Sequence, residues 1–218
     1  MASNQFIKER NKKLAEKVVS ALNKRHFDAF YCEDKNEALY KILEFISKDD
    51  VISWGGSMSI NEIGLVDYLE SNGYKTINRD KAKDPQEKLK CAIDSFSSDI
   101  FLMSANAISE DGQLVNIDGL GNRLAALCFG PKNVFVVAGM NKVSKTIEDA
   151  YQRARTYAAP CNMQRINSLA AKNTPCVKTG SCADCLSEDS ICAQILTTRL
   201  CKPNGRIKVF LVNENLGY

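Results

Sequence analysis

The sequence contains few of the residues that common catalytic and metal sites require. Among its 218 residues, only His26 is a histidine and only Trp54 is a tryptophan. A single histidine excludes a histidine-rich metal site, and it argues against a Ser–His–Asp triad. His26 also follows a basic N-terminal stretch and stands apart from the polar loops described below. Function must therefore rest on other residue types.

The chain also lacks a strong charge imbalance and a long apolar run. It has 29 Lys and Arg against 26 Asp and Glu, a formal net charge of +3. No basic run is interleaved with aromatic residues, so we expect no nucleic-acid partner. No apolar run approaches the roughly 20 residues of a membrane span. Residues 1–26 have no apolar block or cleavage pattern of a secretory signal. We expect no membrane partner and a cytoplasmic location.

The residues that are present are typical of a folded α/β protein. Hydrophobic residues make up 44% of the chain and charged residues 25%. Short apolar runs alternate with helical periodicity over 27–158, which predicts βαβ units. We expect a Rossmann-like fold: a mostly parallel sheet with helices on both faces. Residues 1–218 are interpreted as one domain, with an N-terminal helix (1–26), a cysteine-rich excursion from the sheet (161–203) and a returning strand (206–214).

Two glycines connect a predicted strand to a predicted helix in VISWGGSMSINEIGLVDYL. Gly55 and Gly56 let a ligand approach the backbone, and the N–H groups of the helix N-terminus can hold an anion. Ser57 and Ser59 can add hydroxyl groups. The alternative is a tight connection in which Ser59 caps the helix and Glu62 closes a capping box. In open α/β sheets, such a loop lies where ligands usually bind.

Residues 104–143 concentrate amide and charged side chains at predicted strand ends and turns. Such groups are costly to bury unless they are hydrogen-bonded or meet a ligand. We expect Arg123 and Lys142 to pair with an anion, which amide side chains orient. The alternative is plain turn chemistry. The ligand-binding candidates in this segment are Asn106, Asn116, Asp118, Asn122, Arg123, Asn141 and Lys142.

Three parts of the chain together carry a family resemblance: VISWGGSMSINEIGL, NAISEDGQLVNIDGLGNRLAALCFGPKNVFVVAGMNKV and the tail with its cysteines. They resemble the lactate-utilisation (LUD) domain family, most closely its stand-alone branch with a C-terminal cysteine segment. The resemblance implies a fold similar to the ribose-5-phosphate isomerase and coenzyme A transferase superfamily. It also implies a ligand site at the carboxyl edge of the sheet, facing GGSMS. Some family members act in L-lactate oxidation alongside iron–sulfur partner proteins.

The chain departs from the enzymes of that superfamily at the catalytic positions. Ribose-5-phosphate isomerases use an Asp-rich strand end and a lysine beyond the next turn. This chain has Ser104-Ala105-Asn106 and then Asn116, which argues against sugar-phosphate isomerisation. Coenzyme A transferases use a glutamate nucleophile, and Glu62 is the nearest candidate here. No other catalytic residue is assigned.

Four of the nine cysteines follow the spacing Cys176-x5-Cys182-x2-Cys185-x6-Cys192, with Cys161 as a possible substitute. A Cys-x2-Cys pair places two thiolates on one metal or cluster edge. In a reducing cytosol, clustered cysteines bind metal or do redox chemistry more often than they form structural disulfides. Zinc ribbons favour two Cys-x2-Cys pairs, whereas this segment has one. The single pair and the uneven spacing therefore favour a [4Fe–4S] cluster over zinc. Zinc, redox thiols or disulfides, and four unrelated residues are the alternatives.

The favoured interpretation is a LUD-type redox accessory protein in lactate or hydroxy-acid utilisation. It would bind a small anionic ligand at GGSMS, an iron–sulfur cluster and an iron–sulfur electron-transfer partner. One alternative is a non-catalytic ligand-binding or regulatory module with a structural zinc. Another is a coenzyme A transferase-like enzyme that acts through Glu62. A homo-oligomer is compatible with all three.

Overall fold

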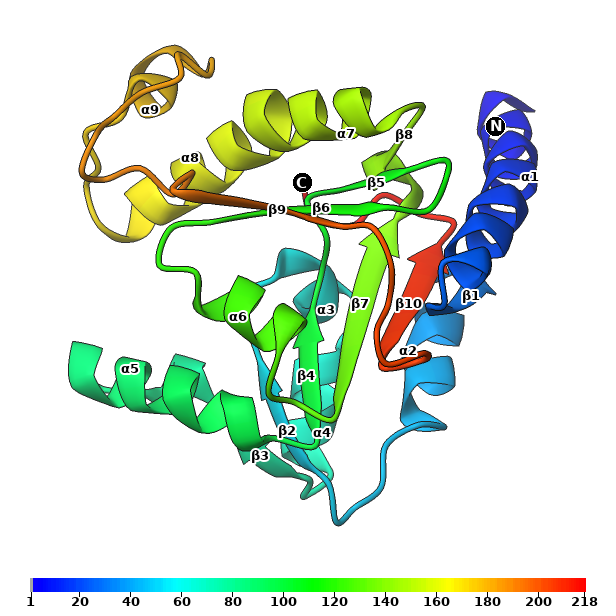
Figure 1. Ribbon diagram of the computed structural model, residues 1–218, viewed down its shortest axis with the longest axis horizontal. Coiled ribbons are helices and arrows are strands. Elements are labelled where there is room, and N and C mark those ends of the chain that lie inside the picture. The colour runs from blue at the N-terminus through cyan, green and yellow to red at the C-terminus, as the bar shows by residue number, and fades with distance from the viewer. Residues whose placement is uncertain (1) are drawn as a thin grey trace.

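The computed structural model describes the backbone of residues 2–218 and the side chains of residues 5–218. Its main sheet has six strands, all parallel, in the order β1–β10–β7–β4–β2–β3 (Figure 1). This sheet confirms the predicted Rossmann-like α/β fold. Its strands are β1 (Asp28–Cys32), β2 (Val51–Trp54), β3 (Lys75–Ile77), β4 (Ile100–Met103), β7 (Asn133–Gly139) and β10 (Ile207–Val212).

Helices cover both faces of this sheet because side chains alternate along each strand. In β7, Val134 and Val136 pack into one apolar cluster, while Phe135 and Val137 pack into another on the opposite face. Residues of α1 and α6 complete the first cluster, and residues of α2, α3 and α4 complete the second. The helices are α1 (Ala2–Lys24), α2 (Lys35–Leu43), α3 (Met58–Glu62), α4 (Leu65–Ser71), α5 (Pro85–Asp94) and α6 (Asn122–Cys128).

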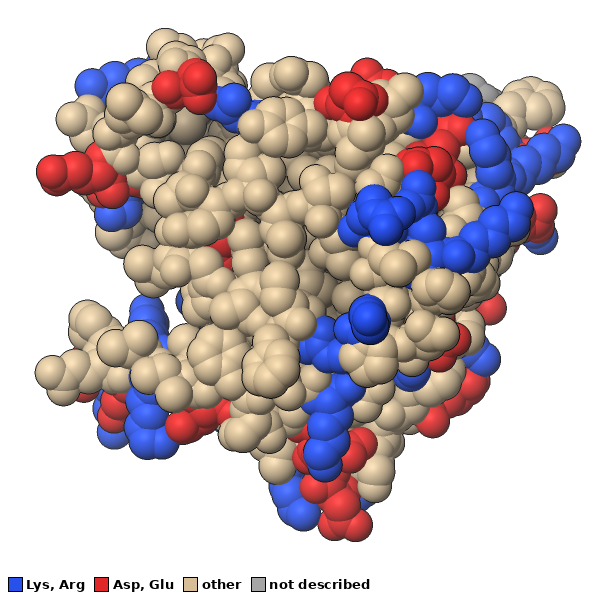
Figure 2. Space-filling model, in the orientation of Figure 1, with Lys and Arg blue, Asp and Glu red and all other residues tan. Residues whose placement is uncertain are grey.

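The helix at the N-terminus is α1, and residue 1 of the predicted range 1–26 lies outside the described residues. Figure 2 shows Lys and Arg side chains gathered over α1, whereas much of the remaining surface in this view is uncharged. Of the helices that the structure describes, none has the length and apolar character needed to cross a membrane.

Local side-chain bonds fix where α5 begins. The Asp84 carboxylate accepts hydrogen bonds from the backbone N–H groups of Gln86 and Glu87, and Pro85 occupies the first turn. The sequence Asp84-Pro85 is typical of such a helix start, since an Asp side chain can cap the free N–H groups and a proline there loses no helical hydrogen bond. Three short 3₁₀ helices link other elements: η1 (Arg79–Lys81), η2 (Ser95–Ser97) and η3 (Met140–Lys142).

A second sheet of four strands, in the order β8–β5–β6–β9, was not predicted. Figure 1 shows it across the end of the main sheet to which the strand arrows point. Its strand β9 lies inside 161–203, the segment that was expected to leave the sheet. The large apolar residues of QILTT, Ile195 and Leu196, are adjacent rather than alternating, so β9 gives a weak strand signal. The strands are β5 (Ala107–Ser109), β6 (Leu114–Asp118), β8 (Val143–Ser144) and β9 (Gln194–Thr198).

One continuous helical segment runs above the second sheet, through the position where the sequence pattern predicted an end at Ala158. The Thr146 side chain and Asp149 form a capping box at its start. A π-helical turn precedes Pro160, which lacks the N–H group that a regular α-helix would use there. The segment comprises α7 (Ile147–Arg153), η4 (Ala154–Ala158) and α8 (Ala159–Leu169), and the short α9 (Pro175–Thr179) follows.

Candidate functional site

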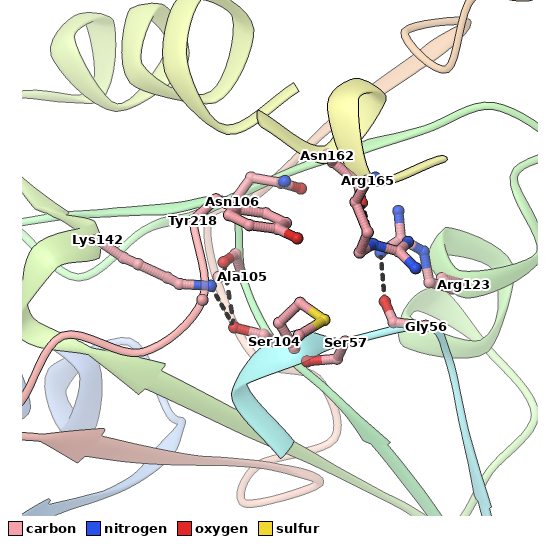
Figure 3. Close-up of a pocket in the computed structure, with 12 residues that line it drawn as sticks. Gly56, Ser57, Ser104, Ala105, Asn106, Arg123, Lys142, Asn162, Arg165 and Tyr218 are labelled. Carbon is pink, nitrogen blue, oxygen red and sulfur yellow. Dashed lines mark hydrogen bonds between the residues drawn. The ribbon is translucent and has the colours of Figure 1, made fainter. Parts of the chain in front are cut away.

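A small polar cavity lies where the chain reverses its direction across the main sheet. From β2 the chain moves to β3 on one side, and it returns to β4 on the other side of β2. In open α/β sheets, ligands bind at such a switch point, beyond the carboxyl ends of the strands. The cavity has a volume of about 50 Å³ (Figure 3). Its lining residues are Gly56, Ser57, Met58, Ser104, Ala105, Asn106, Arg123, Lys142, Asn162, Arg165, Gly217 and Tyr218.

The predicted ligand-binding residues divide into two groups. Those that line the cavity are Gly56, Ser57, Asn106, Arg123 and Lys142. Those that lie outside its lining are Gly55, Ser59, Asn116, Asp118, Asn122 and Asn141. Four members of the second group, Ser59, Asn116, Asp118 and Asn141, hold members of the first group or neighbouring backbone in place. Gly55 leaves room for Arg123, and Asn122 belongs to another cavity described below.

The glycine turn lets an arginine cross the end of β2. A Cβ atom at Gly55 would lie 2.5 Å from Cδ of Arg123, so only glycine leaves room for that side chain. Arg123 then donates from Nη1 to the carbonyl oxygen of Gly56, at 3.3 Å. The hydroxyl of Ser57 is buried and finds no hydrogen-bond partner among the described residues. The turn therefore offers one unused polar group to a ligand.

The predicted capping box at this turn is wrong. Ser57, not Ser59, is the residue at the N-cap, and its side chain makes no capping bond. Ser59 lies inside α3, where its hydroxyl donates to the carbonyl oxygen of Leu216 at 3.3 Å. The carboxylate of Glu62 accepts a hydrogen bond from the backbone N–H of Gly217 at 2.8 Å. Both side chains thus fasten segment 216–217, and Glu62 is not among the cavity-lining residues.

Lys142 is 4% exposed, and its amine faces two hydroxyl groups rather than a carboxylate. Its Nζ lies 3.1 Å from Oγ of Ser59 and 3.0 Å from Oγ of Ser104 (Figure 3). Burial lowers the pKa of Lys142 to about 7, and the charges of Arg153 and Arg123 add to this shift while that of Glu62 opposes it. A substantial fraction of this amine is therefore neutral near pH 7, unlike that of an exposed lysine.

Arg123 is held by all three of its nitrogens. Nε donates to the carboxylate of Asp118 at 3.1 Å, and Nη2 donates to the carbonyl oxygen of Ile117 at 2.8 Å. Nη1 bonds to Gly56, as described above. The carboxylate of Asp118 also accepts from the backbone N–H of Arg123. Asp118 therefore acts on the cavity by fixing Arg123 and by offsetting part of its charge.

Three asparagines that were ligand candidates bond to the protein itself. Asn116 donates to the carbonyl oxygen of Ser104 at 3.0 Å, and Oδ1 of Asn106 accepts from the backbone N–H of Ile117 at 2.9 Å. Asn141 bonds segment 216–217 through both ends of its side-chain amide. Asn106 lines the cavity as well. These bonds fix the walls of the cavity.

Two arginines near the cavity were not among the predicted site residues, and Arg165 was missed because it lies beyond residue 158, where the helical pattern was expected to end. Arg165 lines the cavity, and its Nε donates to Oδ1 of Asn162 at 3.0 Å. Arg153 lies behind the lining and donates to the carbonyl oxygens of Asn141 and Asn106, at 2.9 and 2.6 Å. The signal that could have located Arg165 is its spacing of three from Asn162, which places both on one helix face.

A larger cavity of about 720 Å³ lies between α5 and α6. Its lining includes Trp54, Leu89, Ile93, Phe101 and Asn122. Figure 2 shows α5 projecting from the molecule, with uncharged surface on the side that faces α6. Asn122 therefore stands at this apolar groove rather than at the polar cavity.

The four predicted metal-ligand cysteines line one cavity of about 190 Å³ on the opposite side of α8. These residues are Cys176, Cys182, Cys185 and Cys192. Burial raises the pKa of the Cys192 thiol, and the other three thiols raise it further. Cys161 does not line this cavity. All nine cysteines are free thiols, so the described chain contains no disulfide.

The residue types around this cavity suit a negatively charged cluster. The sulfur atoms, however, do not lie close enough together to bind one metal ion. Within residues 2–218, no group of three or more Cys, His, Asp or Glu side chains is placed to hold a metal ion. Arg155 nevertheless points at the cysteines, with Nη2 3.8 Å from Sγ of Cys182. Its Nε is buried and has no partner in the described chain. The guanidinium already pairs with Asp184 through Nη2, so a cluster with four thiolates would add an acceptor and further negative charge beside it.

The fold and the polar cavity together define a Rossmann-like α/β protein with a polar cavity at its switch point. Comparison with known proteins gives the family. The family model of the LUD domain matches residues 15–212, so the chain belongs to the LUD domain family. In general terms, this makes it a lactate-utilisation-related protein.

A solved structure supports the fold. The chain is similar to a DUF162 family protein from Deinococcus radiodurans, with a TM-score of 0.53 and 10% sequence identity. The match covers 94% of this chain and 98% of that one. At this identity the likeness shows the fold alone. No curated protein matches the chain.

Proposed function

We propose that the protein is a redox accessory protein of hydroxy-acid utilisation that binds a small 2-hydroxy or 2-oxo carboxylate in the polar cavity. The observation that carries this proposal is the presence of Arg123, Arg165 and Lys142 around a cavity of about 50 Å³. Pockets that enclose larger ligands measure roughly 300–1,000 Å³. A small acid fits this space, whereas a nucleotide or a coenzyme A thioester would remain outside it.

Arg165 is the main carboxylate-binding residue in this proposal. Its Nε bonds to Asn162, which leaves the two terminal nitrogens without a partner among the described residues. A guanidinium group binds a carboxylate through two parallel hydrogen bonds. Arg123, whose three nitrogens all have protein partners, contributes charge rather than a free pair of donors.

The proposal is tested by measuring pyruvate and L-lactate binding to the whole chain by calorimetry. Arg165→Gln should weaken binding at least ~10-fold, because a hydrogen bond to a charged group contributes about 1.5–3 kcal/mol. The control is Arg10→Gln, an exposed position on α1. The carboxylate site is refuted if neither acid binds the wild-type protein, or if Arg165→Gln binds as tightly as the control.

The second part of the proposal is a [4Fe–4S] cluster held by Cys176, Cys182, Cys185 and Cys192. It is supported by the shared cavity of the four thiols and by the unpartnered Nε of Arg155. The cluster would accept one electron from a reduced iron–sulfur partner protein and pass one electron on, with no bond broken in this chain. A structural zinc is the competing occupant of the same thiols.

Metal content separates these occupants. Protein purified without oxygen should be brown and contain iron and sulfide in stoichiometric amounts. The double variant Cys182→Ser/Cys185→Ser should lose both, whereas Cys161→Ser, whose side chain lies outside the cavity, should keep them. Colourless protein with one zinc per chain would show that the cysteines hold a structural zinc instead of the cluster. Protein without any metal would remove the metal from the proposal.

A further inference from the structure

Lys142 is the sole buried lysine among the described side chains, and its surroundings do not stabilise a positive charge. Its hydrogen-bond partners are the neutral hydroxyls of Ser59 and Ser104. The cations Arg153 and Arg123 disfavour its protonated form, and the nearest carboxylate, that of Glu62, is bonded to Gly217. A desolvated lysine beside other cationic groups is the usual form of an amine nucleophile.

The cavity exposes this amine to a ligand from one side only. Segment 216–217 covers its other side, because a Cβ atom at Gly217 would lie 3.4 Å from Nζ of Lys142. Figure 3 shows the amine entering from one side, next to Ser104, with Arg123 and Arg165 on the far side. An acid whose carboxylate meets Arg165 would therefore extend its second carbon toward Lys142.

We propose that Lys142 forms a Schiff base with the carbonyl carbon of a 2-oxo acid bound in the polar cavity. This inference rests on the carboxylate site proposed above, and it narrows the ligand class from small acids in general to 2-oxo acids such as pyruvate. A 2-hydroxy acid has no carbonyl carbon, so it binds in the same place without reacting.

The reaction conserves atoms and requires no electron acceptor. The lone pair of Nζ attacks the second carbon of the acid, a C–N bond forms, and the π electrons of the carbonyl move to its oxygen, which takes a proton. The nitrogen loses one proton, which leaves a neutral carbinolamine; its second proton then passes to the hydroxyl as the C–O bond breaks, the nitrogen lone pair forms the C=N bond and the oxygen leaves as water. The products are an imine and one water molecule.

Ser104 is placed to supply the proton to the carbonyl oxygen. Its hydroxyl lies 3.0 Å from Nζ of Lys142 and lines the cavity, so it can pass a proton between the amine and the leaving oxygen. Ser59 is also bonded to Nζ but is buried outside the lining, which makes it a positioning residue. Loss of Ser104 should therefore slow the reaction without removing the reacting atom.

Reductive trapping tests the proposal directly. The whole protein is incubated with pyruvate and cyanoborohydride, which reduces an imine to a stable amine, and is then measured by intact mass and peptide mapping. We expect one adduct per chain, on the peptide that contains Lys142. L-lactate should give none. Lys142→Arg should lose the adduct and Lys13→Arg, an exposed control on α1, should keep it. Ser104→Ala should form it about 100-fold more slowly, at the low end of general acid–base contributions.

The outcomes distinguish this inference from the function on which it rests. Binding of pyruvate by calorimetry without any trapped adduct overturns the Schiff base and leaves the carboxylate site standing. Adducts spread over exposed lysines, or an adduct that persists in Lys142→Arg, also overturn it. Absence of both binding and adduct removes both proposals. If Lys142→Arg does not fold, the position of the adduct in the wild-type peptide map decides the question.

Discussion

The helical segment from α7 to α8 separates two cavities that are built in different ways. On one side, several side chains of the polar cavity are bonded to the protein, such as Arg123 with its three acceptors, although the buried hydroxyl of Ser57 has no partner in the described chain. On the other side, the cysteines lie on a stretch with little regular structure, and Arg155 retains a buried Nε–H without a partner in the described chain. Each site therefore keeps a buried polar group without a partner in the described chain, but the first is held by more hydrogen bonds between its own residues than the second.

The π-helical turn η4 relates the two sites, because it follows Arg153 directly and contains Arg155. Arg153 donates to the backbone at the polar cavity, while Arg155, two residues later, faces Cys182 and Asp184. Residues two apart on a helix point in different directions. One helix thus supplies a cation to each cavity, and the local geometry at η4 determines which cation faces which site.

The largest effect expected from this difference concerns the cysteine segment. Cluster assembly should slow tryptic cleavage at Lys178 at least ~100-fold, since a ligand at about 100 times its Kd stabilises the ordered state by about 2.7 kcal/mol. Saturating pyruvate should leave this rate unchanged, because its site is already formed. The measurement is the rate of cleavage with and without the reconstituted cluster. Equal rates would mean that the segment is as preorganised as the polar cavity.

The comparison also shows which features the sequence could predict. The parallel sheet follows from apolar strands alternating with helical periodicity, and the start of α5 follows from Asp84 and Pro85, since both signals are local. By contrast, β9 is recognisable only through its pairing with β6. Arg165 reaches the site only because the helix continues through Pro160. Features that depend on contacts between distant segments left no local pattern to detect.

The capping box illustrates the same limit within a few residues. The pattern S-x-x-E fits Ser59 and Glu62, yet the helix begins at Met58, after Ser57. Both side chains instead bond to segment 216–217, which is far away in the sequence. The S-x-x-E motif is present in the sequence, but contacts with segment 216–217 give its two side chains a different role.

The next largest effect is the pH dependence that Lys142 gives to stability. Its pKa is lowered to about 7 in the folded protein from an ordinary value of 10.5, so the unfolded chain binds the extra proton between these values. Wild-type stability should therefore rise with pH relative to Lys142→Met, by up to about 1.4 kcal/mol per pH unit above pH 7. Urea unfolding at pH 7, 8 and 9 measures this change.

The groups that face Lys142 are Arg153, Arg123 and Glu62. All three groups are present in both proteins, so the difference in slope between wild type and Lys142→Met belongs to the lysine. Lys13→Met, an exposed control on α1, should show a constant difference from wild type. A constant difference for Lys142→Met as well would show that its amine remains protonated in the folded state, and the polar cavity would then bind anions by charge alone.

A smaller effect is expected at the glycine turn. Gly55→Ala should lower the free energy of unfolding by about 1–2 kcal/mol, because overpacking a close contact usually costs about 1–3 kcal/mol. The new Cβ would displace Arg123 from the carbonyl oxygen of Gly56, so pyruvate binding should weaken too. For stability, Gly56→Ala is the matched control, since its Cβ would meet nothing closer than 3.9 Å. Equal losses of stability in the two variants would contradict the proposed role of Gly55.

The smallest effect has opposite signs in stability and in binding. Asp118→Asn keeps an oxygen that can accept from Arg123 but removes the charge, so stability should fall by about 1 kcal/mol. Carboxylate affinity should rise slightly, by about 3-fold, because the cavity becomes more positive. Calorimetry with pyruvate measures the second effect, and Asp67→Asn, exposed on α4, serves as the control. Weaker binding in Asp118→Asn would mean that Asp118 matters more for the position of Arg123 than for its charge, and hence that even this well-bonded cavity depends on a single carboxylate to keep its shape.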